Sequence, residues 1–186
     1  MRFLNSRKEM EKYVGYPATG WTNMWTQEIH VVANDSEDRI VKTPIKHEIM
    51  HMITMTTWGY PHENLIWLNE GLATYAGDDC NEITAGEIYN YFLTEEMLLP
   101  IDSLTNSFHA QDDMIAYHQS AYIVEYLMKK YGVKKIEELW RKGFASFSEV
   151  YGVSFTEMVA SLNKTVVEQH KNSPVIDWAG YNKECG

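Results

Sequence analysis

The chain has 186 residues and a net charge of −10, and 45% of its residues are hydrophobic and 23% charged. This length suffices for one domain with a hydrophobic core, and the composition is ordinary for a soluble globular protein. The acidic balance argues against a protein that binds nucleic acid or an anionic membrane surface, because both functions need basic patches.

The cysteines and the N-terminus give limited information about the cellular location. Cys80 and Cys185 are the two cysteines, and the absence of a Cys-x-x-Cys pair argues against a cysteine metal site. A disulfide between them and two free thiols are both compatible with the sequence. The first thirteen residues are too polar for a signal peptide, and no apolar run approaches the roughly 18 residues of a membrane span. We therefore expect a cytoplasmic protein without a membrane span.

The N-terminal part of the chain predicts a short helix followed by extended structure. A helix over residues 6–14 begins at Ser6, whose hydroxyl can cap it, and Glu9 can complete a capping box. Glycine and proline residues then break the chain. The stretch 21–32 is rich in Trp, Thr, Ile and Val with partial alternation, which predicts a strand, and residues 34–38 predict a turn.

Helices dominate the rest of the chain. Pro44 suits the first turn of a helix that Thr43 can cap and that should end near Thr57. Further helices are predicted over residues 67–76, 84–98, 113–130, 134–141 and 155–170, whereas 100–112 and 172–186 show no clear period. Gly132 is suited to close the longest of these helices. The sequence therefore predicts a mainly helical α+β fold with a small N-terminal sheet.

The helix that begins near Pro44 carries a metal-binding motif. Residues 47–51 read H-E-x-x-H, and residues four apart lie on one face of a helix. The imidazoles of His47 and His51 can therefore reach one Zn²⁺. The apolar residues expected to anchor the other side of this helix in the core are Ile45, Ile49, Met52 and Ile53. The simpler alternative is a helix with two surface histidines.

A third candidate ligand lies in a second motif. Eighteen residues separate His51 from Glu70, which stands in the sequence W-L-N-E-G-L-A over residues 67–73. The two motifs together resemble those of gluzincins of the aminopeptidase N type and of the smaller peptidase MA-like domains related to them. The resemblance implies a zincin-like domain in which His47, His51 and Glu70 hold one zinc ion per chain. Without the family, Glu70 could be a surface carboxylate on an amphipathic helix.

The H-E-x-x-H motif also supplies a candidate general base. Glu48 adjoins His47 and should point into the cleft, where it can take a proton from metal-activated water and pass it to the leaving amine. This chemistry predicts zinc-dependent hydrolysis of peptide bonds in a peptide or protein substrate. The second ring nitrogens of the histidines need acceptors. Thr74, Asp78 and Asp79 lie near Glu70 in the sequence and are candidates among which the sequence does not choose.

A tyrosine in the longest predicted helix resembles a functional residue of the same family. Residues 116–122 read A-Y-H-Q-S-A-Y, similar to the Y-x-x-[GS] helix of these enzymes. The resemblance implies that Tyr117 donates a hydrogen bond to the oxyanion of the tetrahedral intermediate. Tyr122 and Tyr126 fit the core face of this helix, so a core position is the alternative for Tyr117. His118 could also contribute, although a solvated or core-edge histidine explains it equally simply.

The chain departs from the aminopeptidases of this family upstream of the metal motif. Those enzymes carry a G-x-M-E-N segment whose Glu holds the free amino terminus of the substrate. The nearest analogue here, residues 20–25, reads G-W-T-N-M-W and has no Glu at the equivalent place, although Glu28 could substitute. We also expect no counterpart of the large additional domains of those enzymes. We therefore expect a small endopeptidase or a peptidase with one dedicated substrate, with an aminopeptidase as the alternative.

Two other classes of protein compete with a peptidase. One is a non-catalytic zinc-binding regulatory protein, against which Glu48 argues because a structural site needs no base beside an open position. The other is a protein-interaction module in which H-E-x-x-H is accidental. A zymogen-like arrangement, with the tail after Lys171 over the cleft, is a further possibility. The resemblance covers about residues 20–165 of a single expected domain, 1–186, and leaves the oligomeric state open.

Overall fold

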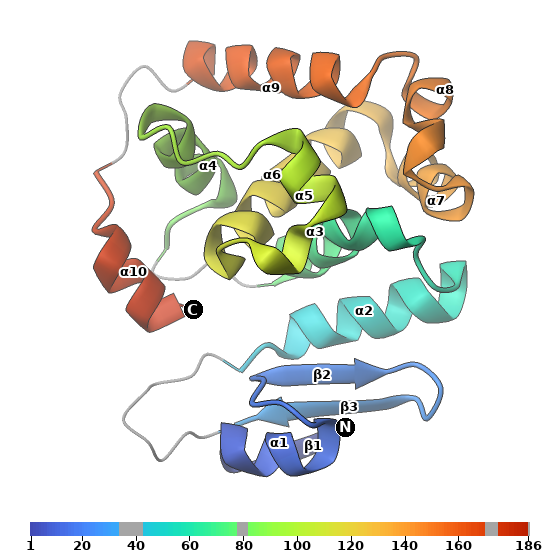
Figure 1. Cartoon of the computed structure of the whole chain (residues 1–186), viewed down its shortest axis with the longest axis vertical. Helices are drawn as coiled ribbons and strands as arrows, with labels where there is room; N and C mark the ends of the chain where they lie inside the picture. The colour runs from blue at the N-terminus through green and yellow to red at the C-terminus, as the bar shows by residue number, and fades with distance from the viewer. Residues whose placement is uncertain (34–42, 78–81, 170–174, 186) are drawn as a thin grey trace.

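Figure 1 shows the computed structural model of the chain, which describes residues 1–33, 43–77, 82–169 and 175–185. A three-stranded sheet and helix α1 (Arg7–Val14) form one end of the molecule, and helices form the rest. Helix α2 (Ile45–Trp58) lies between these two parts (Figure 1). The predicted mainly helical α+β fold with a small N-terminal sheet is confirmed. Among the described helices, none has the combined length and hydropathy that crossing a membrane requires.

The sheet consists of β1 (Arg2–Leu4), β2 (Gly20–Asn23) and β3 (Glu28–Val32) in the order β1-β3-β2. Strand β1 runs parallel to β3, and β2 runs antiparallel to β3. The sequence prediction missed β1, whose three residues are too few to show a period. Strand β2 is an edge strand, and it packs against α2.

The prediction of a single strand over residues 21–32 is wrong, because the chain reverses within it. The side-chain oxygen of Asn23 accepts hydrogen bonds from the backbone N–H groups of Trp25 at 2.9 Å and Thr26 at 3.2 Å. Asn side chains commonly stabilise turns in this way. Gln27 then adopts a φ of 54°, which completes the reversal into β3. The expected turn over residues 34–38 lies outside the described residues.

Helix α1 begins as predicted at Ser6, whose hydroxyl oxygen accepts a hydrogen bond from the Glu9 N–H at 3.1 Å. The carboxylate of Glu9 accepts from the N–H of Asn5 at 2.8 Å and so extends the cap by one residue. The helix covers the outer side of the sheet, where Met10 packs with Leu4 and Val32 in a small apolar cluster.

Helix α2 differs from its prediction in its cap and in the side that it buries. The Thr43 side chain does not cap it, and the Thr43 carbonyl instead accepts from the N–H of Ile45 at 2.8 Å. Of the four residues of the expected core face, Ile49 is 37% and Ile53 51% exposed, and Ile45 and Met52 are half-buried. The residues of α2 that are buried are Glu48, His51 and Thr54. The sheet and α3 cover the polar side of this helix, so the prediction of its core face is wrong.

The remaining helices form the larger half of the molecule. They are α3 (Ile66–Ala76), α4 (Ala85–Thr94), α5 (Ile101–Asn106), α6 (Asp113–Tyr131), α7 (Val133–Lys142), α8 (Phe147–Tyr151), α9 (Phe155–Gln169) and α10 (Trp178–Cys185). Helices α3 and α6 form the most extensive helix pair. Gly71 allows their close approach, because a Cβ atom there would lie 2.8 Å from the carbonyl oxygen of Ser120. Packing against α6 therefore fixes the position of α3, the helix that carries the second motif.

Three sequence predictions in this half need correction. Helix α4 ends at Thr94 rather than near residue 98, and the segment 100–112 contains α5 and a 3₁₀ turn rather than being irregular. The tail forms α10, which packs on α4 through a contact of 5.0 Å between the ring centroids of Trp178 and Phe92. Aromatic contacts of Trp178 with Tyr91 and Phe92 hold this helix against α4, although its sequence shows no clear period. Cys80 lies outside the described residues.

Candidate active site

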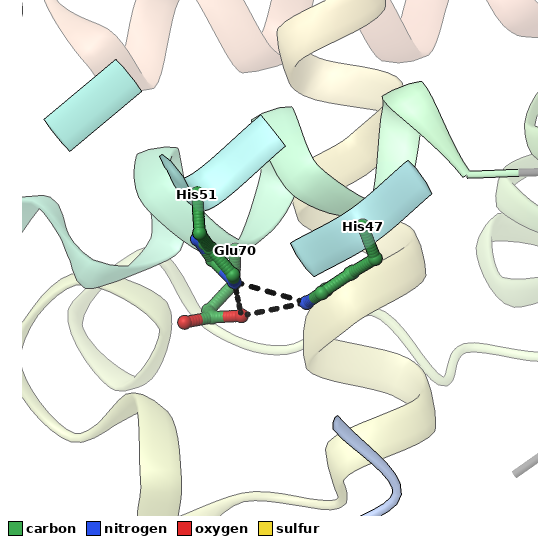
Figure 2. Close-up of side chains that lie close together, drawn as sticks. All are labelled: His47, His51 and Glu70. Carbon is green, nitrogen blue, oxygen red and sulfur yellow. Dashed lines mark hydrogen bonds and ion pairs between the residues drawn. The ribbon is translucent and has the colours of Figure 1, made fainter. Parts of the chain in front are cut away.

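The H-E-x-x-H motif and the second motif meet between α2 and α3. His47 and His51 lie one turn apart on α2, and their Nε2 atoms are 3.0 Å apart. Glu70 projects toward them from α3, with its Oε2 atom 3.4 Å from His47 Nε2 and 3.3 Å from His51 Nε2 (Figure 2). In the parts of the chain that are described, this is the one group of His, Cys, Asp or Glu side chains close enough to hold a metal ion.

The charge of Glu70 dominates the electrostatics of this cluster. Burial favours the neutral carboxyl, but hydrogen bonds with His47 and His51 outweigh it and lower the pKa of Glu70 to about 2. Burial likewise favours a neutral His51, yet its contacts with Glu70 raise the pKa of this histidine above its ordinary value. A carboxylate that stays ionised beside two imidazoles forms a donor set for a divalent cation.

Asn69 orients His51 from the side opposite the cluster. The Nδ1 atom of His51 lies 3.0 Å from the side-chain oxygen of Asn69, and both side chains are buried. An amide oxygen can only accept, so Nδ1 donates its proton to Asn69 and Nε2 is the ring nitrogen that faces Glu70. The amide nitrogen of Asn69 also donates to Oε1 of Glu70 at 3.2 Å. One side chain thus holds two members of the cluster.

The sequence prediction missed the role of Asn69. The sequence feature that could have indicated this role is the position of Asn69 directly before Glu70 in the second motif. From α3 its side chain reaches His51 on α2. Thr74, one of the acceptors considered from the sequence, lines the cleft, but its buried hydroxyl makes no hydrogen bond. Asp78 and Asp79 lie outside the described residues.

Glu48 lies beside the cluster but is held by the sheet. It is 5% exposed, and its Oε2 atom accepts a hydrogen bond of 2.6 Å from the hydroxyl of Thr22 on β2. Burial raises the pKa of Glu48 above its ordinary value, and the hydrogen bond from Thr22 only partly offsets this effect. A carboxylate with a raised pKa is a stronger base than an exposed one. The sequence prediction did not identify Thr22.

Tyr117 also reaches the cluster, from helix α6. Its ring stacks on that of His47 with 6.1 Å between centroids, and Phe108 packs against it at 5.3 Å. Burial raises the pKa of Tyr117, and the charge of Glu70 adds to this effect. The phenol is therefore a neutral hydrogen-bond donor next to the three-residue cluster. Tyr122 points elsewhere on the same helix, with its ring 4.8 Å from that of Tyr89.

The three-residue cluster lies in a cleft of about 1270 Å³. Its walls come from β2, α2, α3, α4, α6 and α10. The lining residues that matter for the site are Thr22, His47, Glu48, His51, Asn69, Glu70, Tyr117, His118 and Tyr181. Glu28 is exposed at the start of β3 and is not part of this lining, so the expectation that it could replace the missing Glu is not supported.

Helix α10 forms part of the wall of this cleft through Tyr181. Tyr181 is buried, and its hydroxyl lies 3.4 Å from Nε2 of His118. Burial lowers the pKa of His118 to about 4, so this histidine is neutral. The described part of the tail packs on α4, where Tyr181 lies in one apolar cluster with Ile88 and Phe92.

Comparison with known proteins agrees with this arrangement. Residues 15–167, well over half of the chain, match the Peptidase MA superfamily. Searches of the curated proteins and of the solved structures found no significant match. The match supports a metallopeptidase type of function and confirms the resemblance carried by the two motifs. The fold, the cluster and this match together show that the chain belongs to the Peptidase MA superfamily.

Proposed function

We propose that the protein is a zinc-dependent peptidase in which His47, His51 and Glu70 bind the metal. The spacing of the three donor atoms, 3.0–3.4 Å, carries this proposal. Tetrahedral ligands about 2.0–2.1 Å from zinc lie about 3.3–3.4 Å from one another, so the donors need little movement. Two imidazoles and one carboxylate with a base beside them are typical of catalytic rather than structural zinc sites.

In the proposed hydrolysis, each of the side chains around the cluster has a separate role. A zinc ion held there would act as a Lewis acid on the scissile carbonyl and on the attacking water. A carboxylate oxygen of Glu48 takes the proton of that water and later delivers it to the nitrogen of the leaving amine. The phenol of Tyr117 donates a hydrogen bond to the carbonyl oxygen as negative charge develops on it. Asn69 keeps the Nδ1 proton of His51 in place throughout.

The acidic residues of the cleft bear on the choice between an endopeptidase and an exopeptidase. Its acidic lining residues are Glu48, Glu70, Asp113 and Glu125, and β2 contributes none of them. An exopeptidase needs a charged group placed to hold a substrate terminus, and residues 20–25, the nearest analogue of the aminopeptidase segment, contribute no carboxylate to the described cleft. We therefore propose an endopeptidase or a peptidase with one dedicated substrate.

A peptide-library experiment on metal-analysed protein tests this function. We expect one zinc per chain by elemental analysis and internal cleavage of peptides with acetylated amino termini, read by mass spectrometry. A chelator should abolish cleavage, and added zinc should restore it. Release of single residues only from peptides with free amino termini would identify an aminopeptidase. Zinc binding without any cleavage would identify a non-catalytic zinc protein instead.

Tyr117→Phe is expected to lower kcat by about 10²–10³-fold, or roughly 2.7–4 kcal/mol, with KM nearly unchanged. The substitution removes a hydroxyl that acts mainly in the transition state, while the ring keeps its contacts with His47 and Phe108. Steady-state kinetics, zinc content and the melting temperature are measured together. Tyr122→Phe is the control, since Tyr122 lies outside the cleft lining and should keep kcat. Equal turnover by wild type and Tyr117→Phe would exclude the oxyanion role.

A further inference from the structure

Strand β2 contacts the general base at two points. Thr22 and Gly20 are two positions apart, so they face the same side of the strand, toward α2. The following inference rests on the proposed function of Glu48 as the general base. We propose that Thr22 and Gly20 are positioning residues, which together hold the carboxylate of Glu48 in one orientation beside the metal cluster.

The hydroxyl of Thr22 lies within hydrogen-bond distance of both the side chain and the backbone of Glu48. Its Oγ1 atom is 2.6 Å from Glu48 Oε2 and 3.0 Å from the Glu48 carbonyl oxygen. A distance of 2.6 Å is typical of a hydroxyl that donates to an ionised carboxylate, which is among the stronger hydrogen bonds in proteins. Because Glu48 is 5% exposed, water cannot readily replace a lost partner.

Gly20 provides the space that the carboxylate occupies. A Cβ atom at this position would lie 2.3 Å from Oε1 of Glu48 and 2.8 Å from its Cδ and Cγ atoms. Gly20 has no positive φ, so its backbone would accept alanine without strain. The absence of a side chain therefore serves the fit of Glu48 and not a turn. An alanine here would push the carboxylate away while leaving the strand intact.

Fixing the carboxylate matters because a Glu side chain has several rotatable bonds. A base contributes to proton transfer only in the orientation that reaches the attacking water, and a displacement of about 1 Å can cost 10²-fold in rate. The two contacts from β2 restrict Glu48 before substrate binds. The sheet thus contributes to catalysis without touching the reacting atoms.

The test compares Thr22→Val, Thr22→Ser and Gly20→Ala with wild type. Valine keeps the β-branched shape of threonine and removes the hydroxyl, so we expect kcat to fall about 10–100-fold with zinc content unchanged. Thr22→Ser restores the hydroxyl and should recover most of this loss. Gly20→Ala should lower kcat at least as much as Thr22→Val. Thr26→Val is the matched control, because Thr26 donates to Glu28 at 3.0 Å in the exposed turn of the same hairpin.

Crystal structures of the metal-free variants supply a readout that does not depend on activity. We expect the Glu48 carboxylate to leave β2 in Thr22→Val and Gly20→Ala and to keep its place in Thr22→Ser. An unchanged carboxylate in the first two variants would overturn the proposal, as would wild-type kcat in both. A loss that serine does not recover would show that Thr22 acts through its shape. If wild type cleaves no peptide, the proposed function fails and the structures alone decide the positioning role.

Discussion

Replacing Glu48 with Gln is expected to lower the rate of peptide hydrolysis by about 10²–10⁴-fold while one zinc per chain stays bound. The amide has the shape of the carboxylate but cannot take a proton from the attacking water. Its side-chain oxygen can still accept the hydrogen bond from Thr22, which lies 2.6 Å from Glu48 in the wild type. Single-turnover kinetics and elemental analysis on the same sample measure both quantities.

The control for this substitution is a second carboxylate in the same cleft. Glu125 lines the cleft, forms an ion pair with Lys129 and is not one of the three candidate metal ligands. Glu125→Gln should keep both zinc and hydrolysis near wild type. Activity of Glu48→Gln within about tenfold of wild type would exclude a general base of ordinary strength. Loss of zinc in Glu48→Gln would show instead that this residue supports the metal.

Glu70→Ala is expected to weaken zinc binding by more than about 100-fold and to abolish hydrolysis as a consequence. Loss of a residue that only supports a ligand already costs about 10–100-fold in metal affinity, so loss of a ligand should cost more. The substitution removes a carboxylate oxygen 3.3–3.4 Å from both histidine nitrogens and leaves two imidazoles as candidate ligands. Competition with a chelating dye measures the affinity, and elemental analysis measures the stoichiometry after dialysis.

Glu125→Ala is the matched control for metal binding. It removes a carboxylate from the same cleft without touching the cluster, so it should retain one zinc per chain. Equal zinc affinity in Glu70→Ala and wild type would show that the third ligand has been assigned wrongly. A circular dichroism spectrum close to that of wild type is also needed, because Glu70 lies on a helix that packs against α6.

The sequence by itself determined that two of the three candidate metal ligands lie together. His47 and His51 lie on one face of a helix in any fold, because 3.6 residues per turn place positions four apart together. The sequence also predicted the helix ends that depend on neighbouring residues, such as the N-cap at Ser6 and the C-cap at Gly132. Glu70 could be assigned only through the resemblance of its motif, since its approach to α2 depends on how α3 packs.

The covered side of α2 was decided by the tertiary structure alone. Periodicity identifies residues that share a face, and Ile49 and Ile53 do share one. It does not show which neighbouring element covers that face. Here β2 and α3 lie against the opposite side, so the polar residues Glu48 and His51 are buried and the two isoleucines are exposed.

The residues that orient the site also depend on the packing of elements distant in sequence. Thr22 lies 26 positions before Glu48, and Asn69 lies 18 positions after His51. Each residue makes its hydrogen bond to a different element of the fold. The local sequence around Thr22 or Asn69 does not show which residue of that other element will lie next to it. Local structure follows from short-range preferences, which a sequence shows directly. The orientation of a catalytic side chain follows from long-range contacts, which exist only once β2, α2 and α3 have packed together.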